Sequence, residues 1–458
     1  MVWIEKVKSE VPVAITIAGS DSGGGAGIQA DLKTFAALGV HGTTAITSIT
    51  AQNTYSVTAV EDLKPEMIRE QIKAVAEDLG IDAGKTGMLH TEEIIKAVSL
   101  EVSKYGFPLV VDPVMIAKSG APLLKPEAMD VLENDLLPKA TVVTPNRFEA
   151  EKLAGMRIKN LKDAEVAARK ISEMGPKAVV IKGGHLEGEE AVDLLYYKGK
   201  FKTFSAPRLD VKTTHGTGCS FSAAIAAELA KKMDIPEAIE IAKKVVALGI
   251  KFGLKIGQGY GPVNPMAHLY RESSRYNVLT NLEKAKNLVE ATPEVVTLVP
   301  EVGMNIAMAI PYAENIADVA AIEGRIVKTS KGAKAAGNPK FGCSSHLARY
   351  LLEIIKHDES KMAAINLKFS EETLKILGNL GVTISFYDRK KEPKKIKKVE
   401  GMTVQWGARK IIKKTGKVPD VIYHRGDIGK EPMIVIFGEQ AYDLAKLTVQ
   451  LTEEMEKT

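Results

Sequence analysis

The sequence predicts an α/β protein with two domains. The first has a central, mostly parallel sheet flanked by helices, and the second is a smaller α/β domain. Apolar runs of strand length alternate with segments whose apolar residues recur at helical spacing, as in parallel sheets covered by helices. A glycine-rich turn joins the first such strand to the first such helix. The length of 458 residues is enough for two or three separate cores.

The first domain opens with a short buried-type strand at residues 13–18, followed by the glycine-rich segment 19–27. Apolar residues at helical spacing come next, and Gly39 closes this helix. Three further strands are predicted, at residues 109–111, 141–143 and 178–181. The last two helices are predicted at about residues 221–231 and 235–254.

A short polar stretch, residues 270–277, interrupts the pattern, and we place the boundary between the domains there. The two domains are therefore expected to span residues 1–272 and 279–458. No sequence repeat relates them. In the second domain we expect helices at residues 279–291 and 345–356, and strands at residues 295–299 and 433–437.

The composition is that of a globular protein, with 45% hydrophobic and 26% charged residues. A net charge of +5 is small for this length and does not call for a nucleic-acid partner. The first twelve residues lack the apolar core of a signal peptide, and no apolar run is long enough to span a membrane. The two cysteines, Cys219 and Cys343, lie far apart, so we expect a protein of the reducing cytoplasm.

Three motifs are set aside as decoys. Residues 80–86 resemble a phosphate-binding P-loop but lack its first glycine. Residues 25–30 match a loose dinucleotide fingerprint, but the acidic residue expected about 20 positions later is missing. The basic run at residues 389–398 has no interleaved aromatic residues and contains proline, so we interpret it as a solvated loop.

Residues 213–223 contain the strongest chemical signal. The backbone amides of Gly216, Thr217 and Gly218 are expected to point at one anion, assisted by the positive end of the helix that follows. Cys219 lies in the same field, which would favour its thiolate. The combination suits phosphoryl transfer to a hydroxyl group. The alternative is an ordinary helix start with a small buried cysteine.

Four segments in order along the chain carry a resemblance: residues 19–31, 51–54, 118–120 and 215–219. Together they resemble the hydroxymethylpyrimidine/phosphomethylpyrimidine kinases of thiamine biosynthesis, a ribokinase-like family, over about residues 12–270. The wider superfamily usually has aspartate where this chain has Cys219. The resemblance implies two ATP-dependent phosphorylations, first to the phosphate and then to the diphosphate, in one pocket. It implies that Cys219 is the general base and that Gly19, Asp31 and Gln52 bind the pyrimidine.

Polar residues follow three of the predicted strands: Asp112 after the first, Asn146 and Glu149 after the second, and Lys182 after the third. Strand ends of open α/β sheets are where ligands bind. The carboxylates Asp112 and Glu149 suit Mg²⁺ that bridges ATP phosphates, while Asn146 and Lys182 suit the phosphates themselves. Helix capping is the alternative for the first three residues, and surface solvation is the alternative for Lys182.

The second domain is predicted to contain an anion site. Gly342 frees a turn, and Ser344 or Ser345 can cap the helix that follows. His346 and Arg349 share one face of this helix, and the helix start should keep the imidazole neutral. The carboxylate of Asp427 could bind Mg²⁺ or merely shape its loop. A capped histidine and surface arginines are the alternative reading. Arg325 is another candidate for binding a diphosphate.

These segments resemble the archaeal-type thiamine-phosphate synthase domain over about residues 280–455, a domain often fused behind the pyrimidine kinase. The resemblance implies that pyrimidine diphosphate condenses with thiazole phosphate and releases diphosphate. It makes Arg325 and His346 the catalytic candidates, with Gly342, Ser344, Ser345 and Arg349 binding substrate.

Two alternatives remain open. The second domain could sense thiamine phosphates instead of forming them, or the first could be a pyridoxal-type vitamin kinase, because pyridoxal also carries a hydroxymethyl group on a heteroaromatic ring. In every case we expect small-molecule partners, no nucleic acid, no membrane and a homo-oligomer.

Overall fold

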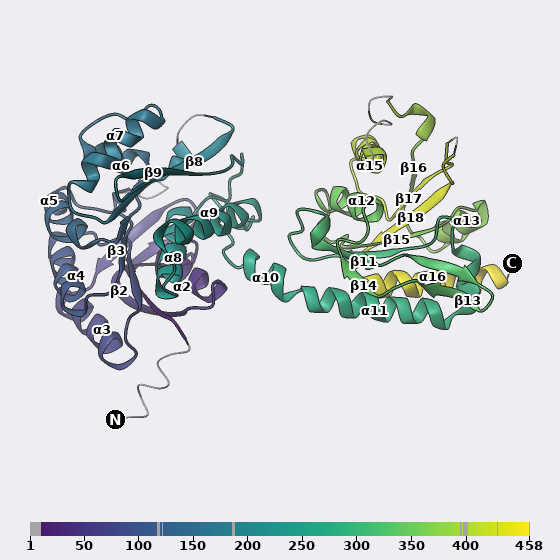
Figure 1. Ribbon diagram of the computed structural model, residues 1–458, viewed down its shortest axis with the longest axis horizontal. Coiled ribbons are helices and arrows are strands. Elements are labelled where there is room, and N and C mark those ends of the chain that lie inside the picture. The colour runs from purple at the N-terminus through teal and green to yellow at the C-terminus, as the bar shows by residue number, and fades with distance from the viewer. Residues whose placement is uncertain are drawn as a thin grey trace. The chain divides into compact units, whose positions relative to one another are not determined.

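The computed structural model describes residues 11–116, 120, 122–185, 188–393, 396, 402–427 and 429–457. The chain divides into two compact units, Met1–Leu269 and Tyr270–Thr458. Each unit is a sheet covered by helices on both faces (Figure 1). Among the described residues, no helix is both long and apolar enough to cross a membrane.

The first unit contains a nine-stranded sheet in the order β3-β2-β1-β4-β5-β6-β7-β8-β9. The six strands from β2 to β7 in this order are parallel to one another, whereas β3, β8 and β9 pair antiparallel at the two edges. This confirms the expected mostly parallel sheet. The strands are β1 (Val13–Asp21), β2 (His41–Gln52), β3 (Val57–Asp62), β4 (Ala83–Thr86), β5 (Leu109–Val111), β6 (Val142–Val143), β7 (Ala178–Ile181), β8 (Glu190–Tyr197) and β9 (Lys200–Pro207).

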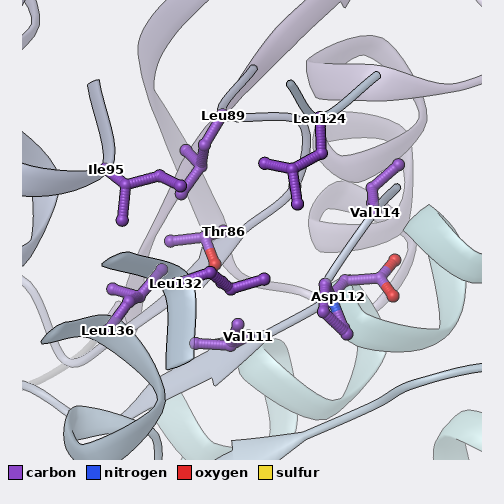
Figure 2. A pocket seen from close by; sticks show the side chains of 11 residues that line it. Thr86, Leu89, Ile95, Val111, Asp112, Val114, Leu124, Leu132 and Leu136 are labelled. Atoms are coloured by element: carbon purple, nitrogen blue, oxygen red, sulfur yellow. The ribbon is translucent and has the colours of Figure 1, made fainter. Parts of the chain in front are cut away.

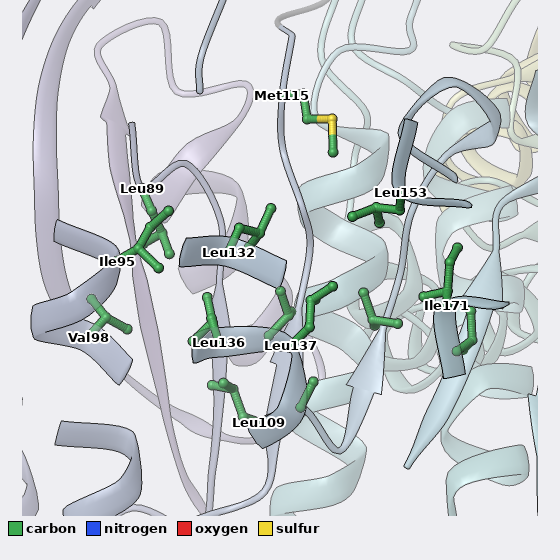
Figure 3. Close-up of a cluster of buried hydrophobic side chains, with 14 of the residues drawn as sticks. Leu89, Ile95, Val98, Leu109, Met115, Leu132, Leu136, Leu137, Leu153 and Ile171 are labelled. Atoms are coloured by element: carbon green, nitrogen blue, oxygen red, sulfur yellow. The ribbon is translucent and has the colours of Figure 1, made fainter. Parts of the chain in front are cut away.

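Alternation along the strands divides the interior of this unit into two cores. In β5, Leu109 and Val111 face one core and Val110 faces the other, because successive side chains of a strand point to opposite faces. The first core packs against α3, α4, α6 and α7, and the second against α2, α8 and α9. Figure 3 shows part of the first core, with side chains from α4, α6 and α7. The helices are α2 (Gly27–Ala37), α3 (Pro65–Asp78), α4 (Glu92–Tyr105), α5 (Met129–Val131), α6 (Arg147–Ala154), α7 (Leu161–Ser172), α8 (Thr217–Ala230) and α9 (Ile235–Lys251).

The second unit contains a seven-stranded sheet in the order β14-β11-β10-β15-β18-β17-β16. Only β16 and β17 run parallel. Helices α11, α13 and α16 cover one face, and α12 and α15 cover the other. The strands of this sheet are β10 (Ile306–Ala309), β11 (Val319–Ile322), β14 (Pro339–Phe341), β15 (Ala363–Lys368), β16 (Ile384–Phe386), β17 (Val421–His424) and β18 (Met433–Gly438), and a separate hairpin is formed by β12 (Ile326–Thr329) and β13 (Gly332–Ala335). The helices are α11 (Arg275–Ala291), α12 (His346–Ile355), α13 (Glu371–Asn379), α15 (Met402–Thr415) and α16 (Ala441–Glu456).

Three local predictions are corrected. Helix α8 begins at Thr217 instead of residue 221, so Cys219 lies inside its first turn. The polar stretch 270–277 is helical, divided between α10 (Ala267–Ser273) and α11. The strand expected at residues 295–299 is instead the 3₁₀ helix η5 (Pro293–Leu298), because proline favours a helix start and the three-residue spacing buries Val295 and Leu298 on one side.

Candidate active sites

The first site lies at the carboxyl edge of the parallel strands. Strands β1 and β2 end at Asp21 and Gln52, and Asp112, Asn146 and Lys182 come just after the ends of β5, β6 and β7. Parallel strands bring their carboxyl ends to one edge, so residues far apart in the sequence meet there.

Asp21 holds the glycine-rich loop in place. Its carboxylate accepts hydrogen bonds from the amides of Gly23, Gly25 and Ala26 at 2.7–3.1 Å. Nε2 of His215 lies 2.9 Å from Asp21 Oδ2 and 3.4 Å from the amide nitrogen of the Gln52 side chain. Burial raises the pKa of Asp21, but the hydrogen bonds from His215 and the loop amides outweigh it and hold the pKa below its ordinary value.

The turn at Gly216 packs directly on the glycine-rich loop. Gly216 has φ of 79°, and a Cβ built on it would lie 1.8 Å from the carbonyl oxygen of Gly25. The turn leads directly into α8, and among the described residues the amides of Gly216, Gly218 and Cys219 have no backbone acceptor. First-turn amides of a helix without an acceptor form an anion-binding site.

Gly216→Ala is expected to lower both stability and kinase turnover. The added methyl group forces a left-handed backbone on alanine and also displaces the glycine-rich loop. Gly199→Ala is the matched control, because Gly199 has φ of 74° and open space around it. In the control, the free energy of unfolding should fall only by the strain of the left-handed backbone, about 1–2 kcal/mol. Urea unfolding and kinase assays check this, and equal effects of the two substitutions would contradict it.

Cys219 lies between charged groups. Desolvation raises the pKa of its thiol to about 11, with Asp31 and Asp112 acting in the same direction and Lys85 and the backbone amide of Gly27 opposing them. The expectation of a favoured thiolate is therefore wrong. The field of the helix start is weaker than the loss of water around the sulfur.

Asp31 is buried with Lys85. Neither side chain has exposed surface, and Lys85 Nζ lies 2.8 Å from Asp31 Oδ2, which also accepts a hydrogen bond from Thr16 at 2.6 Å. Burial would lower the pKa of Lys85, but Asp31 raises it above its ordinary value. Lys85 belongs to the rejected P-loop motif, and the structure places it in strand β4. Asp31 is thus a buried residue of α2.

Asp112 and Lys182 form an ion pair, with 2.8 Å between Oδ1 and Nζ. A Cβ on Gly218 would lie 3.3 Å from this Nζ and 3.4 Å from Asp112 Oδ2, so the pair borders the anion turn. Lys182 is thus no surface lysine. Glu149 and Asn146 cap α6 reciprocally, so the capping alternative for these two residues is real.

The carboxylates Asp112 and Glu149 fit a magnesium ion. Burial raises the pKa of Glu149 to about 7, with Asp112 adding to the shift and Lys182 opposing it, so a nearby cation would stabilise its ionised form. Among the described residues no group of three metal-binding side chains occurs. Phosphate oxygens and water would have to complete the coordination, as is usual for Mg²⁺ with nucleotides.

An apolar pocket adjoins Asp112 (Figure 2). Its lining includes Leu89, Leu132 and Leu136, and the carboxylate of Asp112 points away from these side chains. Thr86 and Asp112 are the polar side chains of the lining, and we assign no ligand to the pocket. Lys118 and Ser119, which carried part of the resemblance, lie outside the described residues.

The second site surrounds the start of α12. Gly342 has φ of 74°, as a free turn requires, and His346 is the first helical residue. Ser345 makes no side-chain capping hydrogen bond, so that expectation for Ser345 is wrong; Ser344 is partly buried beside it. Arg325 is held at φ of 72° and donates to the Val302 carbonyl.

His346 is the centre of a cationic cluster. Its side chain keeps an exposed face, yet desolvation by the protein around it lowers its pKa to about 4, and four cations act in the same direction. The imidazole is therefore neutral, as predicted. The four cations are Arg389, Arg325, Lys430 and Arg349.

A polar turn closes this site. Gly426 has φ of 78°, and the backbones of Asp427 and Lys430 hydrogen-bond to each other. The amide of Gly426 donates to Nδ1 of His424, which is buried. This backbone pairing supports the loop-shaping role of Asp427, and its role as a magnesium ligand stays a prediction.

Comparison with known proteins covers both halves of the chain. Residues 21–264 match the phosphomethylpyrimidine kinase family, and residues 281–450 match the thiamine-phosphate synthase ThiN family. The bifunctional thiamine biosynthesis protein ThiDN of Methanocaldococcus jannaschii is 34% identical over 437 residues, covering 95% of this chain and 97% of that protein. The chain belongs to this bifunctional family. It therefore combines a hydroxymethylpyrimidine/phosphomethylpyrimidine kinase with a thiamine-phosphate synthase.

Relatives of the kinase domain alone are more similar in sequence. The hydroxymethylpyrimidine/phosphomethylpyrimidine kinase of Bacillus subtilis is 49% identical over 256 residues, covering 56% of this chain and 94% of that protein. The pyridoxal kinase of Bacillus subtilis, solved as an ADP complex, is 42% identical with a TM-score of 0.53, covering 56% of this chain and 98% of that one. The Staphylococcus aureus pyridoxal kinase with ADP is 39% identical with a TM-score of 0.54, covering 57% and 95%. The ribokinase-like fold of the kinase domain is thus established.

Sequence reasoning missed several residues of both sites. In the kinase domain these are Asp21, Lys85 and His215, and in the synthase domain they are Arg389 and His424. The aspartate within the glycine-rich segment was a usable signal, because aspartate side chains often cap turn amides. The basic run was interpreted as a solvated loop, yet its first residue, Arg389, faces the synthase site.

Stability of the synthase domain is expected to fall as the pH drops below 6.5. Burial lowers the pKa of His424 from 6.5 to about 3, with Arg389 and His346 adding to the shift. The unfolded chain binds the proton first, so the stabilisation is complete above pH 6.5 and is lost progressively below it. At pH 5 the loss is about 2 kcal/mol. Urea unfolding of the parent and of His424→Gln at pH 7 and pH 5 measures this loss. The same decrease in unfolding free energy in both proteins would contradict the prediction.

Proposed function

We propose that the turn at Gly216 and the start of α8 hold the phosphoryl group that the kinase transfers. The observation that carries this proposal is the meeting of acceptor-free amides, the Asp112–Lys182 pair and Cys219 at one sheet edge. Lys182 would bind phosphate oxygens, and the amides would stabilise charge that develops on the moving group. When bound, Mg²⁺ neutralises phosphate charge, and Asp112 and Glu149 would hold it.

Cys219 is the proposed base on the accepting oxygen. In the first step it takes the proton of the pyrimidine hydroxymethyl group, and that oxygen forms a bond to the γ-phosphorus as the bond to ADP breaks. In the second step a phosphate oxygen of the same substrate is the acceptor. Burial raises the thiol pKa to about 11, and the charge of Lys85 opposes this shift, so Lys85 would help to form the thiolate. Gln52, positioned near His215, is suited to pair with ring nitrogen and exocyclic amine.

Asp31 is a less direct candidate for the pyrimidine. One of its oxygens is taken by Lys85 and Thr16, but the other is buried without a hydrogen-bond partner. That Oδ1 is the atom that would meet a donor group of the ring. Gly19, the other candidate, packs closely on Met88, because a Cβ on it would lie 3.2 Å from the methionine sulfur.

In the synthase domain, we propose that Arg325 and Arg349 bind the diphosphate that leaves the pyrimidine carbon. Cations that absorb the departing charge lower the barrier for this cleavage. The thiazole nitrogen attacks as a neutral nucleophile, so His346 need not remove a proton. Its neutral ring is suited to donate one hydrogen bond to a phosphate oxygen. Gly342, Ser344 and Ser345 form the turn beside it.

A product assay tests the whole proposal. The full chain is incubated with pyrimidine alcohol, ATP, Mg²⁺ and thiazole phosphate, and the products are separated by chromatography. We expect pyrimidine phosphate, pyrimidine diphosphate and thiamine phosphate in sequence. Accumulation of the diphosphate without thiamine phosphate would refute the synthase assignment and favour a sensing domain.

Phosphorylation of pyridoxal is a second candidate for the kinase site. The observation in its favour is the 39–42% identity to the two pyridoxal kinase structures. Comparing kcat/KM for pyridoxal and for the pyrimidine alcohol on the full chain separates the two, and we expect the pyrimidine to be preferred. Assembly into a homo-oligomer stays a prediction.

A further inference from the structure

Arg389 differs from three other arginines of the synthase domain. Arg271, Arg409 and Arg425 each form an ion pair with a carboxylate. Among the described residues no carboxylate pairs with Arg389, and its Nε is buried without a hydrogen-bond partner. Burying part of a guanidinium without a partner costs free energy, so a ligand that supplies one would be bound strongly.

The position of Arg389 is fixed by Tyr387. This ring is 2% exposed and lies on Gly407, where a Cβ would come within 2.6 Å of it. It also meets Trp406 and His424 edge-on, with ring centroids 6.0 Å and 5.4 Å away. The segment that carries Arg389 is thus anchored to α15 and β17. Arg389 is the first residue of the short helix η7 (Arg389–Lys391), and the side chain of Asp388 caps this helix.

Arg389 acts on four neutral side chains. It acts electrostatically on Tyr350, Tyr387, His346 and His424, and all four are uncharged at neutral pH. The hydroxyls of Tyr350 and Tyr387 are buried without a hydrogen bond of good geometry. Two acidic side chains flank the segment: Asp388 accepts a hydrogen bond from the Lys390 amide, and Glu392 uses Oε1 to accept one from Thr403 at 2.6 Å.

Four cations from four separate segments therefore converge on His346. Arg325 precedes β12, Arg349 lies on α12, Arg389 follows β16, and Lys430 closes the turn after β17. Like charges repel, and the arrangement is stable with a multiply charged anion between them. The guanidinium fork suits phosphate oxygens in particular.

We infer that Arg389 is a further substrate-binding residue of the synthase site and that it binds a phosphate group. This inference rests on the proposed synthase reaction, whose two substrates both carry such a group. The chemistry is shared between the diphosphate of the pyrimidine and the phosphate of the thiazole, and the experiment separates them.

The test uses Arg389→Met in the full chain, with Lys390→Met as the matched control, because Lys390 is the exposed neighbour in the same turn. Each substrate of the synthase reaction is varied in turn at saturating levels of the other. Loss of one charge-assisted bidentate contact should raise KM for one substrate about tenfold to a hundredfold. A higher KM for pyrimidine diphosphate assigns the contact to the diphosphate, and a higher KM for the thiazole assigns it to that phosphate. Arg389→Lys should recover only part of the loss.

Binding provides a readout independent of turnover. The chain has two tryptophans, Trp3 and Trp406, so a Trp3→Phe background leaves Trp406, which contacts Tyr387, as the reporter. Inorganic diphosphate should change its emission, with a Kd at least tenfold weaker in Arg389→Met and unchanged in Lys390→Met. KM and Kd within twofold of the parent would overturn the inference. A parent that binds diphosphate but forms no thiamine phosphate would refute the synthase proposal alone.

Discussion

Cys219→Ala is expected to lower kinase turnover by about a hundredfold to ten-thousandfold, the range for loss of one general base. Thiamine phosphate formation from supplied pyrimidine diphosphate should stay unchanged, since Cys219 belongs to the first unit and the cationic cluster to the second. In one preparation, the ATP consumed gives the kinase rate and the thiamine phosphate formed gives the synthase rate.

Cys343→Ala is the matched control for this variant. Cys343 is the other cysteine of the chain, and its thiol donates to the carbonyls of Ala321 and Lys340 in the second unit. It should leave the kinase rate unchanged. Equal kinase rates in Cys219→Ala and the parent would refute the base assignment, and the raised thiol pKa would then indicate a cysteine retained for packing.

Lys85→Met is expected to lower the free energy of unfolding by about 3–5 kcal/mol, the usual cost of removing one partner of a buried ion pair. Neither Lys85 nor Asp31 has exposed side-chain surface, so water cannot replace the lost cation. Burial already raises the pKa of Asp31, and without Lys85 its folded-state pKa should rise further. Protonation of Asp31 then stabilises the folded variant. The variant's loss of unfolding free energy should therefore be smallest at low pH, and it should grow as the pH rises above the pKa that Asp31 has in the unfolded chain.

Denaturant unfolding at pH 4 and 7 measures this effect. Lys96→Met serves as the control, because Lys96 forms an exposed pair with Glu92 on the surface of α4. The double variant Lys85→Met with Asp31→Asn should recover stability at pH 7, since no buried charge remains. A single variant as stable as the parent at both pH values would contradict the description of the pair.

The sequence was sufficient for the main features of the kinase domain. A strand, a glycine-rich turn and an amphipathic helix are local patterns, and their alternation predicted the sheet. The stretch around Cys219 was located by the same local logic. The expected strand at residues 295–299 failed because four apolar residues fit a strand or a short helix equally well, and the proline before them decided the outcome.

Long-range pairs could not be predicted from spacing. Asp21 and His215 are 194 residues apart and meet only because the end of β1 and the start of α8 share one edge of the sheet. Asp31 looks exposed in its helix until β4 places Lys85 against it. The sign of the Cys219 pKa shift likewise depends on burial, which no local pattern reports. Arg389 could not be singled out from the sequence. The lysines that follow it predict a solvated loop, and this pattern does not report the direction of the first side chain.

The most direct test of the kinase assignment is a crystal structure with Mg²⁺ and a non-hydrolysable ATP analogue. We predict that oxygens of the terminal phosphate lie about 2.7–3.2 Å from backbone nitrogens of residues 216–219. Lys182 should contact the same phosphate, and the sulfur of Cys219 should face the acceptor side. A terminal phosphate bound elsewhere, with those amides bonded only within the chain, would contradict the account.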